Sequence, residues 1–440
     1  MTAVAGDAAE SPGAAPGRVT GTPSRTGRRD QALAVGLGLL LLGATAVGAV
    51  AEHAAGRPWM DLAVYRAAGQ AVLAGQPLYE VVTDLGLEYT YPPLTSVLFV
   101  PFALLGVDAA VAVWTVLSVL CLVLLCWVVL AGLGVATPER RPLLAVLATT
   151  AALPLYPVAN HLVLGQVSVL VVALVVVSTI GARRQSTTGI GVGLAAAAKL
   201  TPLIFIGYLL LSGRGRAAGT AAGVFVAAAA VGFLLFPHDS ATYWSGLFLD
   251  TSRVTADPAR VINQSLRGML LRLTSPAAAA DGAVDPLWLP VAALVGAAGL
   301  VTAAAASRRG QELAGVLCCA VTGLLVSPVS WDHHWIWVVP GLLFLAAHVR
   351  FGPGWFGVAV AWLGVAATFR WEDYPDGADP FLRTGAGALF GNLYVLAGLA
   401  ALAYAACWVC LRPPLASPPQ VRPGTRAAAA GCRRPPTGRR

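Results

Sequence analysis

The sequence predicts an all-α polytopic membrane protein, and three observations lead to this fold class. Of its 440 residues, 57% are hydrophobic and only 11% are charged, whereas a soluble domain carries about 25% charged residues. The mean hydropathy is +0.73. Apolar runs close to the length of a bilayer crossing recur between residues 32 and 411. In lipid, long apolar segments of this kind are stable as helices, because a helix satisfies its own backbone polar groups.

The apolar segments, taken in order, define the expected helices. The segment 189–211 contains Lys199 and Pro202 near its middle, so we interpret it as two short helices that meet at Lys-Leu-Thr-Pro. The prolines of residues 93–107 favour an interfacial helix over a full crossing. About twelve transmembrane helices are expected in all. The expected segments lie at 32–51, 109–134, 143–158, 162–181, 189–211, 217–236, 286–306, 312–326, 335–348, 354–369 and 386–411.

Arginine clusters between the apolar runs give the orientation. The positive-inside rule places these clusters in the cytoplasm. The polar loops 52–92, 237–285 and 370–385 then all lie outside, and together they hold more acids than arginines. We therefore expect a multi-pass protein of the plasma membrane with its polar chemistry on the extracytoplasmic side. The clusters are Arg140/Arg141, Arg183/Arg184, Arg214/Arg216, Arg308/Arg309 and Arg350.

The two ends of the chain differ in composition from its centre. Residues 1–30 and 412–440 are rich in Ala, Gly, Pro and Arg, so we expect disordered cytoplasmic tails that flank a membrane domain of residues 31–411. The net charge of +8 comes from these tails and from the short clusters between spans. That distribution indicates contact with anionic membrane lipids and no nucleic-acid partner.

Asp61 opens the first polar segment after the first expected span. One interpretation makes it a helix N-cap, because it precedes the helical run LAVYRAAGQAVLAG and acids are favoured there. The other makes it a catalytic carboxylate at the outer surface. The two are compatible, since an N-cap would hold the carboxylate in place.

Lys199 is the only lysine in a chain that otherwise uses arginine for every cation. An ammonium group within an apolar stretch is costly and needs a partner. A lysine that extends its charged end to the membrane interface is the structural alternative. The functional interpretation is a phosphate-binding site, because lysine binds phosphate well as a point charge.

The motif SPVSWDHHW, residues 327–335, places Asp332, His333 and His334 at an expected outer helix end. We interpret it as a polar site, with an interfacial aromatic belt as the alternative for its tryptophans. Adjacent histidines on a helix point about 100° apart, and no HExxH or paired CxxC spacing is present. The sequence therefore predicts no metal site.

Two further motifs offer polar side chains at the outer face. Amide, hydroxyl and guanidinium groups suit sugar hydroxyls and phosphate. For NHLVLGQ the alternative is polar helix–helix hydrogen bonding. For VINQSLRGMLLRL the alternative is an ordinary solvated amphipathic helix. The residues are Asn160, His161 and Gln166 in NHLVLGQ, and Asn263, Gln264 and Arg267 in VINQSLRGMLLRL.

In order along the chain, these motifs resemble one known family. They run from D-x-x-x-Y (Asp61, Tyr65) through G-x-P-L-Y (75–79), Y-P-P (91–93), G-Q (165–166), K-x-T-P (199–202) and N-Q-S-L-R (263–267) to S-P-V-S-W-D-H-H (327–334). The set resembles the actinobacterial polyprenyl-phosphate-mannose-dependent α-1,2-mannosyltransferases. These are GT-C fold enzymes of glycosyltransferase family 87, related to the enzyme that elongates phosphatidylinositol mannosides.

The resemblance implies an inverting transfer from a polyprenyl-phosphate sugar donor to a glycolipid acceptor hydroxyl. It implies Asp61 as the base that takes the proton of that hydroxyl. The leaving group is a phosphate, which cations stabilise without a metal or other cofactor. The implied phosphate-binding residues are Lys199, Arg267, His333 and His334, and the implied substrate-binding residues are Tyr65, Asn160, His161, Gln166, Asn263, Gln264 and Asp332.

Two alternatives stay open. A sibling transferase that uses polyprenyl-phosphate arabinose would share the scaffold. A secondary transporter or lipid flippase is the alternative from another class, although transporters keep ionisable residues near the bilayer midplane. No phosphate loop of the GxxxxGK[ST] or GxGxxG type occurs, so neither nucleotide hydrolysis nor a nucleotide cofactor is supported.

Overall fold

The computed structural model describes residues 25–57, 59–182, 184–274, 284–348 and 379–411, together with residues 357 and 364. Among these residues every regular element is helical. Extended chain pairs only at two isolated bridges, Val82 with Glu88 and Asn263 with Trp331. The all-α expectation is therefore confirmed for the part of the chain that the structure describes.

Within the described part of the chain, five helices are long and apolar enough to cross a membrane. A bent pair, α5 (Arg141–Ala152) and α6 (Tyr156–Leu164), turns through 85° and makes a sixth if it is one span. The chain is thus a polytopic helical membrane protein by length and composition. The five long helices are α1 (Arg25–Ala54), α4 (Val107–Leu133), α10 (Gly215–Leu235), α14 (Val284–Arg308) and α19 (Leu393–Leu411).

Shorter helices fill the space between the long ones. The apolar ones are η1 (Pro93–Phe99) with α3 (Val100–Ala103), α7 (Ser168–Val176) with η2 (Val177–Gly181), η3 (Thr201–Leu203) with α9 (Ile204–Leu211), and α15 (Glu312–Val326). The others are α2 (Met60–Ala74), α8 (Gln185–Ala198), α11 (Pro237–Trp244), η4 (Leu247–Leu249), η5 (Thr251–Arg253), α12 (Leu266–Leu273), η6 (Asp332–Trp337), α16 (Val338–His348), η8 (Pro380–Arg383) and α18 (Gly385–Phe390).

The structure agrees with the sequence at some boundaries and differs at others. The expected break in 189–211 is confirmed, since α8 ends at Ala198 and the next helical turn begins at Thr201. The expected single helix 143–158 is wrong, because the chain bends between α5 and α6 where prolines interrupt the backbone ladder. Helix α1 begins at Arg25, so the end of the expected N-terminal tail is helical. Most of 354–369 and 370–385 lies outside the described residues.

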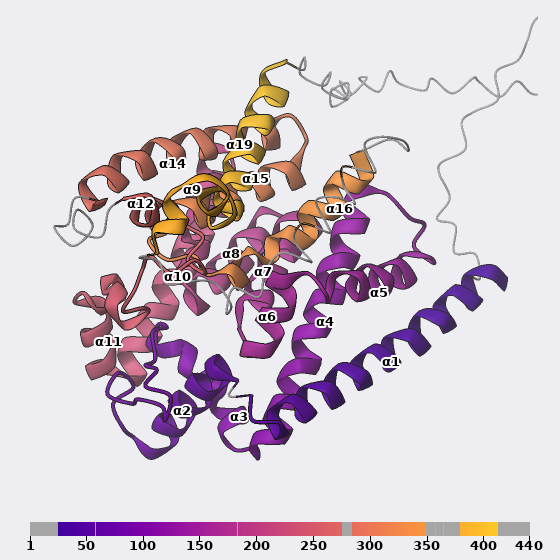
Figure 1. Ribbon diagram of the computed structural model, residues 1–440. Helices are drawn as coiled ribbons and strands as arrows, with labels where there is room; N and C mark the ends of the chain where they lie inside the picture. Colours follow the sequence, from indigo (N-terminus) through magenta and orange to yellow (C-terminus); the bar gives the residue numbers. More distant parts are fainter. Residues whose placement is uncertain are drawn as a thin grey trace, which may run out of the picture.

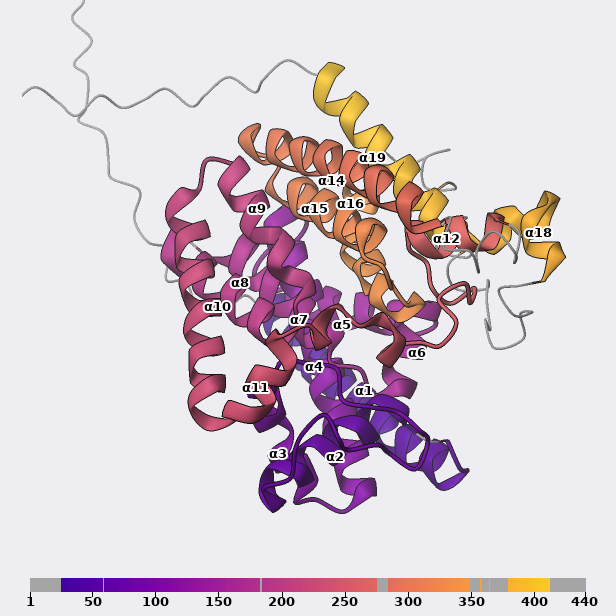
Figure 2. The ribbon, with the colours of Figure 1, turned by 90° about the vertical axis from the view of Figure 1, so that its left-hand side faces the viewer.

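The helical body has two distinct ends (Figures 1 and 2). Helices α2, α3 and α11 lie together at the lower end in both views. In Figure 2 the turn between α9 and α10, the turn between α14 and α15, and the end of α19 lie at the upper end. The arginine clusters Arg214/Arg216 and Arg308/Arg309 lie at those turns and in the helix ends beside them. The first polar loop and these clusters are therefore at opposite ends, as the orientation rule requires.

An aromatic core anchors the lower end. The Tyr65 ring stacks on Phe99 with centroids 4.3 Å apart and planes inclined by 6°. Helix α2 approaches η1 closely at Gly69, where a Cβ atom would lie 2.7 Å from the Phe99 carbonyl oxygen. Glycine is therefore needed there, because any side chain would push the two elements apart. This packing fixes α2, and with it the position of Asp61.

Candidate active site

Asp61 lies in the first turn of α2, which follows Trp59. The N-cap residue is Trp59, so the interpretation of Asp61 as an N-cap is wrong. Trp59 has φ of 43°, a left-handed conformation that is uncommon for a bulky residue. Gly165 packs against this turn, and a Cβ atom there would lie 2.7 Å from the Leu62 Cβ. The close approach brings the Gly-Gln motif next to Asp61.

Gln166 is the centre of a buried hydrogen-bond network. Its Oε1 accepts hydrogen bonds from the hydroxyls of Tyr65 at 3.2 Å, Tyr91 at 3.4 Å and Ser168 at 3.4 Å. The two tyrosine hydroxyls also lie 2.8 Å apart. The Gln166 side chain also favours the ionised form of Asp61. The network therefore joins α2, through Tyr65, to the start of α7.

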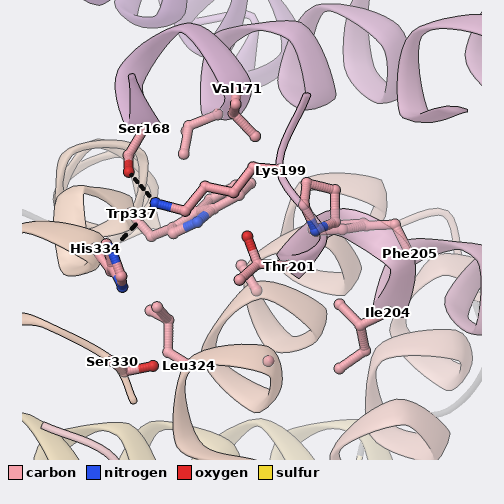
Figure 3. Close-up of a pocket in the computed structure, with 14 residues that line it drawn as sticks. Ser168, Val171, Lys199, Thr201, Ile204, Phe205, Leu324, Ser330, His334 and Trp337 are labelled. Atoms are coloured by element: carbon pink, nitrogen blue, oxygen red, sulfur yellow. Dashed lines mark hydrogen bonds between the residues drawn. The ribbon is translucent and has the colours of Figure 1, made fainter. Parts of the chain in front are cut away.

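Lys199 points inward from the break between α8 and η3 (Figure 3). Its ammonium nitrogen donates to the Ser168 hydroxyl at 3.0 Å and lies 3.1 Å from Nε2 of His334. The same nitrogen lies 5.6 Å from the centroid of the Tyr91 ring. The expectation of a partnered lysine is confirmed, and the alternative of a lysine that reaches out to the interface is wrong.

The histidine motif forms the facing wall of the site. The Asn160 amide donates to Oδ2 of Asp332 at 2.6 Å, and Oδ1 of Asp332 lies 3.6 Å from Nδ1 of His333. The rings of His333 and His334 meet edge to face with centroids 4.7 Å apart. Helix α6 and the turn η6 are thus held together by Asn160 and Asp332, which fixes the histidine pair.

The charges of the site influence one another. Burial raises the pKa of Asp61 above its ordinary value, opposed by His333, by the Gln166 hydrogen bond and by Lys199. Burial lowers the pKa of Lys199 to about 8, opposed by Asp61. Burial, with Lys199 and His333 adding to it, lowers the pKa of His334 well below its ordinary value. His334 is therefore neutral near pH 7, and its Nε2 can accept a hydrogen bond from the Lys199 ammonium.

A cleft opens beside Lys199 between α7, α9 and α15 (Figure 3). One end is polar and the other is apolar, a combination that suits a lipid with an anionic head group. The polar lining residues are Ser168, Lys199, Thr201, Ser330 and His334, and the apolar ones are Val171, Val172, Pro202, Ile204, Phe205, Ala320, Gly323, Leu324 and Trp337.

Three expected site residues contact other parts of the protein. Asn263 and Gln264 have 0% of their surface exposed. The Asn263 amide donates to the Pro258 carbonyl at 2.9 Å, and the Gln264 amide donates to the Val261 carbonyl at 2.6 Å. Arg267 forms an ion pair with Asp285 at 2.8 Å. These contacts direct both side-chain amides to backbone carbonyls of their own loop and hold Arg267 in a separate pair. The backbone of Asn263 pairs with that of Trp331 in the histidine motif.

The remaining expected residues are buried around the site. Tyr65, His161, Gln166, Asp332 and His333 are all buried, whereas Asp61 and Lys199 keep part of their surface exposed. The electrostatic coupling of His161 to His333 and Lys199 places it in the same group. The structure therefore brings together the residues of the D-x-x-x-Y, G-Q, K-x-T-P and histidine motifs.

Sequence reasoning missed Ser168, the residue that bridges Gln166 and Lys199. Its signal was its place two residues after Gln166, at the first turn of a helix. Thr201 and Ser330 also line the cleft and stood inside quoted motifs without an assigned role. Among the described residues, no group of three or more His, Cys, Asp or Glu is arranged to hold a metal ion.

The fold and this cluster define a helical membrane protein in which Lys199, Ser168 and His334 form the polar end of an apolar cleft. Comparison with known proteins gives its class. The model of glycosyltransferase family 87 matches residues 89–328, more than half of the chain. The chain belongs to glycosyltransferase family 87 and is a glycosyltransferase.

Several proteins similar in sequence to this chain are named as mannosyltransferases. A polyprenol-phosphate-mannose-dependent alpha-(1-2)-phosphatidylinositol mannoside mannosyltransferase of Mycobacterium tuberculosis is 37% identical over 355 residues, 76% of this chain and 81% of its own. A protein of the same name from Mycolicibacterium smegmatis is 32% identical over 70% of this chain and 74% of its own. A pentamannoside mannosyltransferase of the latter organism is 29% identical over 70% of this chain and 76% of its own. No solved structure gives a significant match. Membership of a glycosyltransferase family speaks against the transporter and flippase alternative.

Proposed function

We propose that this chain transfers a mannosyl residue from polyprenyl-phosphate mannose to a hydroxyl of a phosphatidylinositol mannoside or related lipoglycan. The reaction takes place on the outer face of the plasma membrane and inverts the anomeric centre. One observation carries the proposal: in a member of glycosyltransferase family 87, Lys199 lies between Ser168 and His334 at the polar end of an apolar cleft. The names of the relatives supply the donor sugar and the acceptor class.

The donor phosphate is placed at the polar end of the cleft in this proposal. Lys199 supplies the charge, and Ser168 and His334, its two hydrogen-bond partners, lie beside it. A phosphate that entered between them would receive a charge-assisted hydrogen bond from the ammonium group. The first isoprene units would then contact the apolar walls of α7, α9 and α15. His333 is the second candidate cation, next to His334.

Asp61 is the proposed base. The acceptor oxygen forms a bond to the anomeric carbon, its proton passes to the Asp61 carboxylate, and the bond from the anomeric carbon to the phosphate oxygen breaks. The electron pair leaves with the polyprenyl phosphate, whose charge the Lys199 ammonium stabilises. A carboxylate with a raised pKa is a stronger base than an ordinary one. Only one carboxylate is needed, because phosphate leaves without an acid.

The other residues fall into two groups. Tyr65, Asn160, His161, Gln166 and Asp332 surround Asp61 and the histidines, and we propose that they bind the sugars or orient these side chains. A direct role for Asn263 or Gln264 would require their buried backbone hydrogen bonds to break. A role for Arg267 at the phosphate would require release from Asp285. We therefore propose Lys199 and His334 as the primary phosphate contacts.

The architecture is proposed to be GT-C, with about twelve transmembrane helices within a catalytic domain of residues 31–411. The five long helices and the bent pair supply up to six crossings, and the shorter apolar helices would supply others. The proposed reaction requires no metal or cofactor, because cationic side chains stabilise the anionic leaving group of the lipid donor.

The direct test is incubation of the purified protein with radiolabelled polyprenyl-phosphate mannose and a panel of phosphatidylinositol mannoside acceptors. We expect a radiolabelled, extended glycolipid. Transfer from polyprenyl-phosphate arabinose, with none from the mannose donor, would replace the proposed sugar. Transfer from neither donor would contradict the proposal.

A further inference from the structure

A fully buried arginine, Arg272, lies behind the histidine motif and has no part in the chemistry above. Its exposed fraction is 0%. Its Nε and Nη2 donate to Oδ1 of Asn392 at 3.0 and 2.7 Å, and its Nη1 donates to the carbonyl oxygens of Arg260 and Asn263 at 2.9 Å each. All of these acceptors are neutral oxygens. Asp257 is near enough to favour the charged guanidinium group, but it forms no ion pair with Arg272. A buried cation without an ion-pair partner is costly, so the fixed hydrogen bonds of Arg272 need an explanation.

The carbonyl groups that Arg272 holds belong to a segment that pairs with the histidine motif. The backbone N–H of Gln264 donates to the Ser330 carbonyl at 2.7 Å, and the backbone N–H of Asp332 donates to the Ile262 carbonyl at 2.9 Å. These two hydrogen bonds fix the backbone of the motif immediately before its histidines.

A side chain of the same segment adds a third link. Oδ1 of Asn263 accepts from the Ser330 amide at 2.9 Å. The side chain of the predicted substrate-binding residue Asn263 is therefore directed at the backbone of the histidine motif.

Asn392 ties this arrangement to a third part of the chain. Its amide donates to the Ala388 carbonyl at 2.8 Å. Gln264 reaches the same region, since its Nε2 donates to the Gly391 carbonyl at 2.8 Å and its Oε1 accepts from the Tyr394 amide at 3.1 Å. The buried guanidinium group thus joins residues 259–263 to Asn392, and residues 262–264 in turn bond residues 330–332. Only arginine offers five donors in a rigid planar fork that can serve all of its acceptors.

We propose that Arg272, acting with Asn392, is a positioning residue that sets the place of His334 against Lys199. The guanidinium group holds the 259–264 segment, that segment holds residues 330–332, and the backbone that follows carries the two histidines. The effect of Arg272 on donor use rests on the proposed function. Its effect on the geometry around Lys199 does not.

The single lysine of the chain makes this geometry measurable without any turnover. The rate at which a small amine-acylating reagent modifies Lys199, followed by mass spectrometry against pH, reports the pKa of its ammonium group. For the wild type we expect a midpoint of about 8. In Arg272→Gln the histidine wall loosens and water reaches the lysine, so the midpoint should rise toward the ordinary value of 10.5.

Matched variants separate positioning from general stability. Arg260→Gln removes an exposed arginine of the same segment and should keep the wild-type midpoint. Asn392→Asp keeps the acceptor oxygen for Arg272 and should also keep the wild-type Lys199 midpoint. Asn392→Leu removes that oxygen and should shift the midpoint upward, as Arg272→Gln does. If Arg272→Gln does not fold, the comparison of Asn392→Asp with Asn392→Leu tests the positioning role. An unshifted Lys199 midpoint in folded Arg272→Gln or in Asn392→Leu would overturn the proposal.

Kinetics give the second measurement. Per folded molecule, Arg272→Gln should raise the donor KM by roughly tenfold, the size of one lost charge-assisted hydrogen bond, with little change in acceptor KM. A purely structural role predicts less folded protein and a lower Tm, with unchanged donor KM, and that result would also overturn the proposal. If the wild type does not use polyprenyl-phosphate mannose, the proposed function fails, and the Lys199 titration still decides the role of Arg272.

Discussion

The ammonium nitrogen of Lys199 lies 3.1 Å from Nε2 of His334, although 135 residues separate them in sequence. Two motifs that are each weak alone therefore meet at one point. Ser168 completes the arrangement at 3.0 Å on the other side of the ammonium group. The proposed donor-phosphate site rests on this geometry, in which a positive charge and two polar neighbours line one end of an apolar cleft.

Lys199→Ala and His334→Ala should weaken donor use more than protein stability. A hydrogen bond to a charged group is worth about 1.5–3 kcal/mol, so the donor KM should rise roughly 10- to 100-fold in Lys199→Ala. Ser168→Ala removes a neutral hydroxyl and should cost less. Steady-state kinetics with a radiolabelled donor measure the change, and the Tm of each variant controls for folding. An unchanged donor KM in Lys199→Ala would show that the lysine is structural.

The pH profile of kcat/KM should be bell-shaped. The base must be ionised, and because the pKa of Asp61 is raised, activity should be lost as pH falls at values above the ordinary Asp pKa of 3.8. Lys199 must be protonated, so activity should also fall as pH rises through about 8. An arginine at position 199 would stay charged across this pH range.

Lys199→Arg is the matched test of the alkaline limb. If it retains activity, that limb should move above pH 8, because the group that titrates there has been replaced. A limb that stays near pH 8 in Lys199→Arg would assign it to another group.

Chelation should leave the reaction intact. The proposed leaving group is a single phosphate stabilised by the Lys199 ammonium, which needs no divalent cation. Activity measured after dialysis against EDTA should equal that of untreated enzyme. Loss of activity with EDTA, restored by one added divalent metal, would contradict the assignment of charge stabilisation to side chains.

The polar loops 52–92 and 237–285 should be accessible from outside the cell. Asp61 lies in the first and α11 in the second, and the arginine turns lie at the opposite end of the body (Figure 2). Single cysteines placed in each loop, in a background with the native cysteines replaced, should react with a membrane-impermeant thiol reagent on intact cells. A cysteine between α9 and α10 should be protected. Labelling with the reverse pattern would place the site in the cytoplasm.

Asp61 and Lys199, which the sequence singled out, lie in one cluster, and the reason that they could be found is physical. In a chain with few charges, Asp61 and Lys199 stand out, because a charged side chain near lipid costs free energy and needs a partner. Small polar residues that hydrogen-bond these charged groups were harder to predict. Ser168 begins an apolar helix, and nothing in its local sequence shows that it faces a lysine 31 residues later.

The direction of polar side chains could not be read from sequence. Arg267 and Arg272 lie on the same short helix, α12. Arg267 belongs to the N-Q-S-L-R motif and was therefore a predicted phosphate contact, yet the structure pairs it with Asp285 and buries Arg272 completely. Asn263 and Gln264 likewise carry amides suited to sugars but direct them to backbone groups. Helix periodicity over eight residues does not reveal which face meets the core.

The helix count shows a similar limit. Hydropathy located the long helices, but it ended one expected segment at residue 158 and began the next at 162, so both boundaries fall inside α6 (156–164), and the 85° turn between α5 and α6 was not predicted. The break at Lys199 was predicted because a charge and a proline coincide there. Where proline alone marks a bend, as between α5 and α6, its angle depends on tertiary packing.

The most direct test of the central claim compares the wild type with Asp61→Asn in mannose transfer from radiolabelled polyprenyl-phosphate mannose. Asparagine keeps the size of the side chain but cannot take a proton, so turnover should fall by about 10²- to 10⁴-fold or more while Tm and membrane insertion are retained. Asp61→Glu, which keeps the carboxylate, should retain more activity than Asp61→Asn. Wild-type turnover in a folded Asp61→Asn variant would contradict the account.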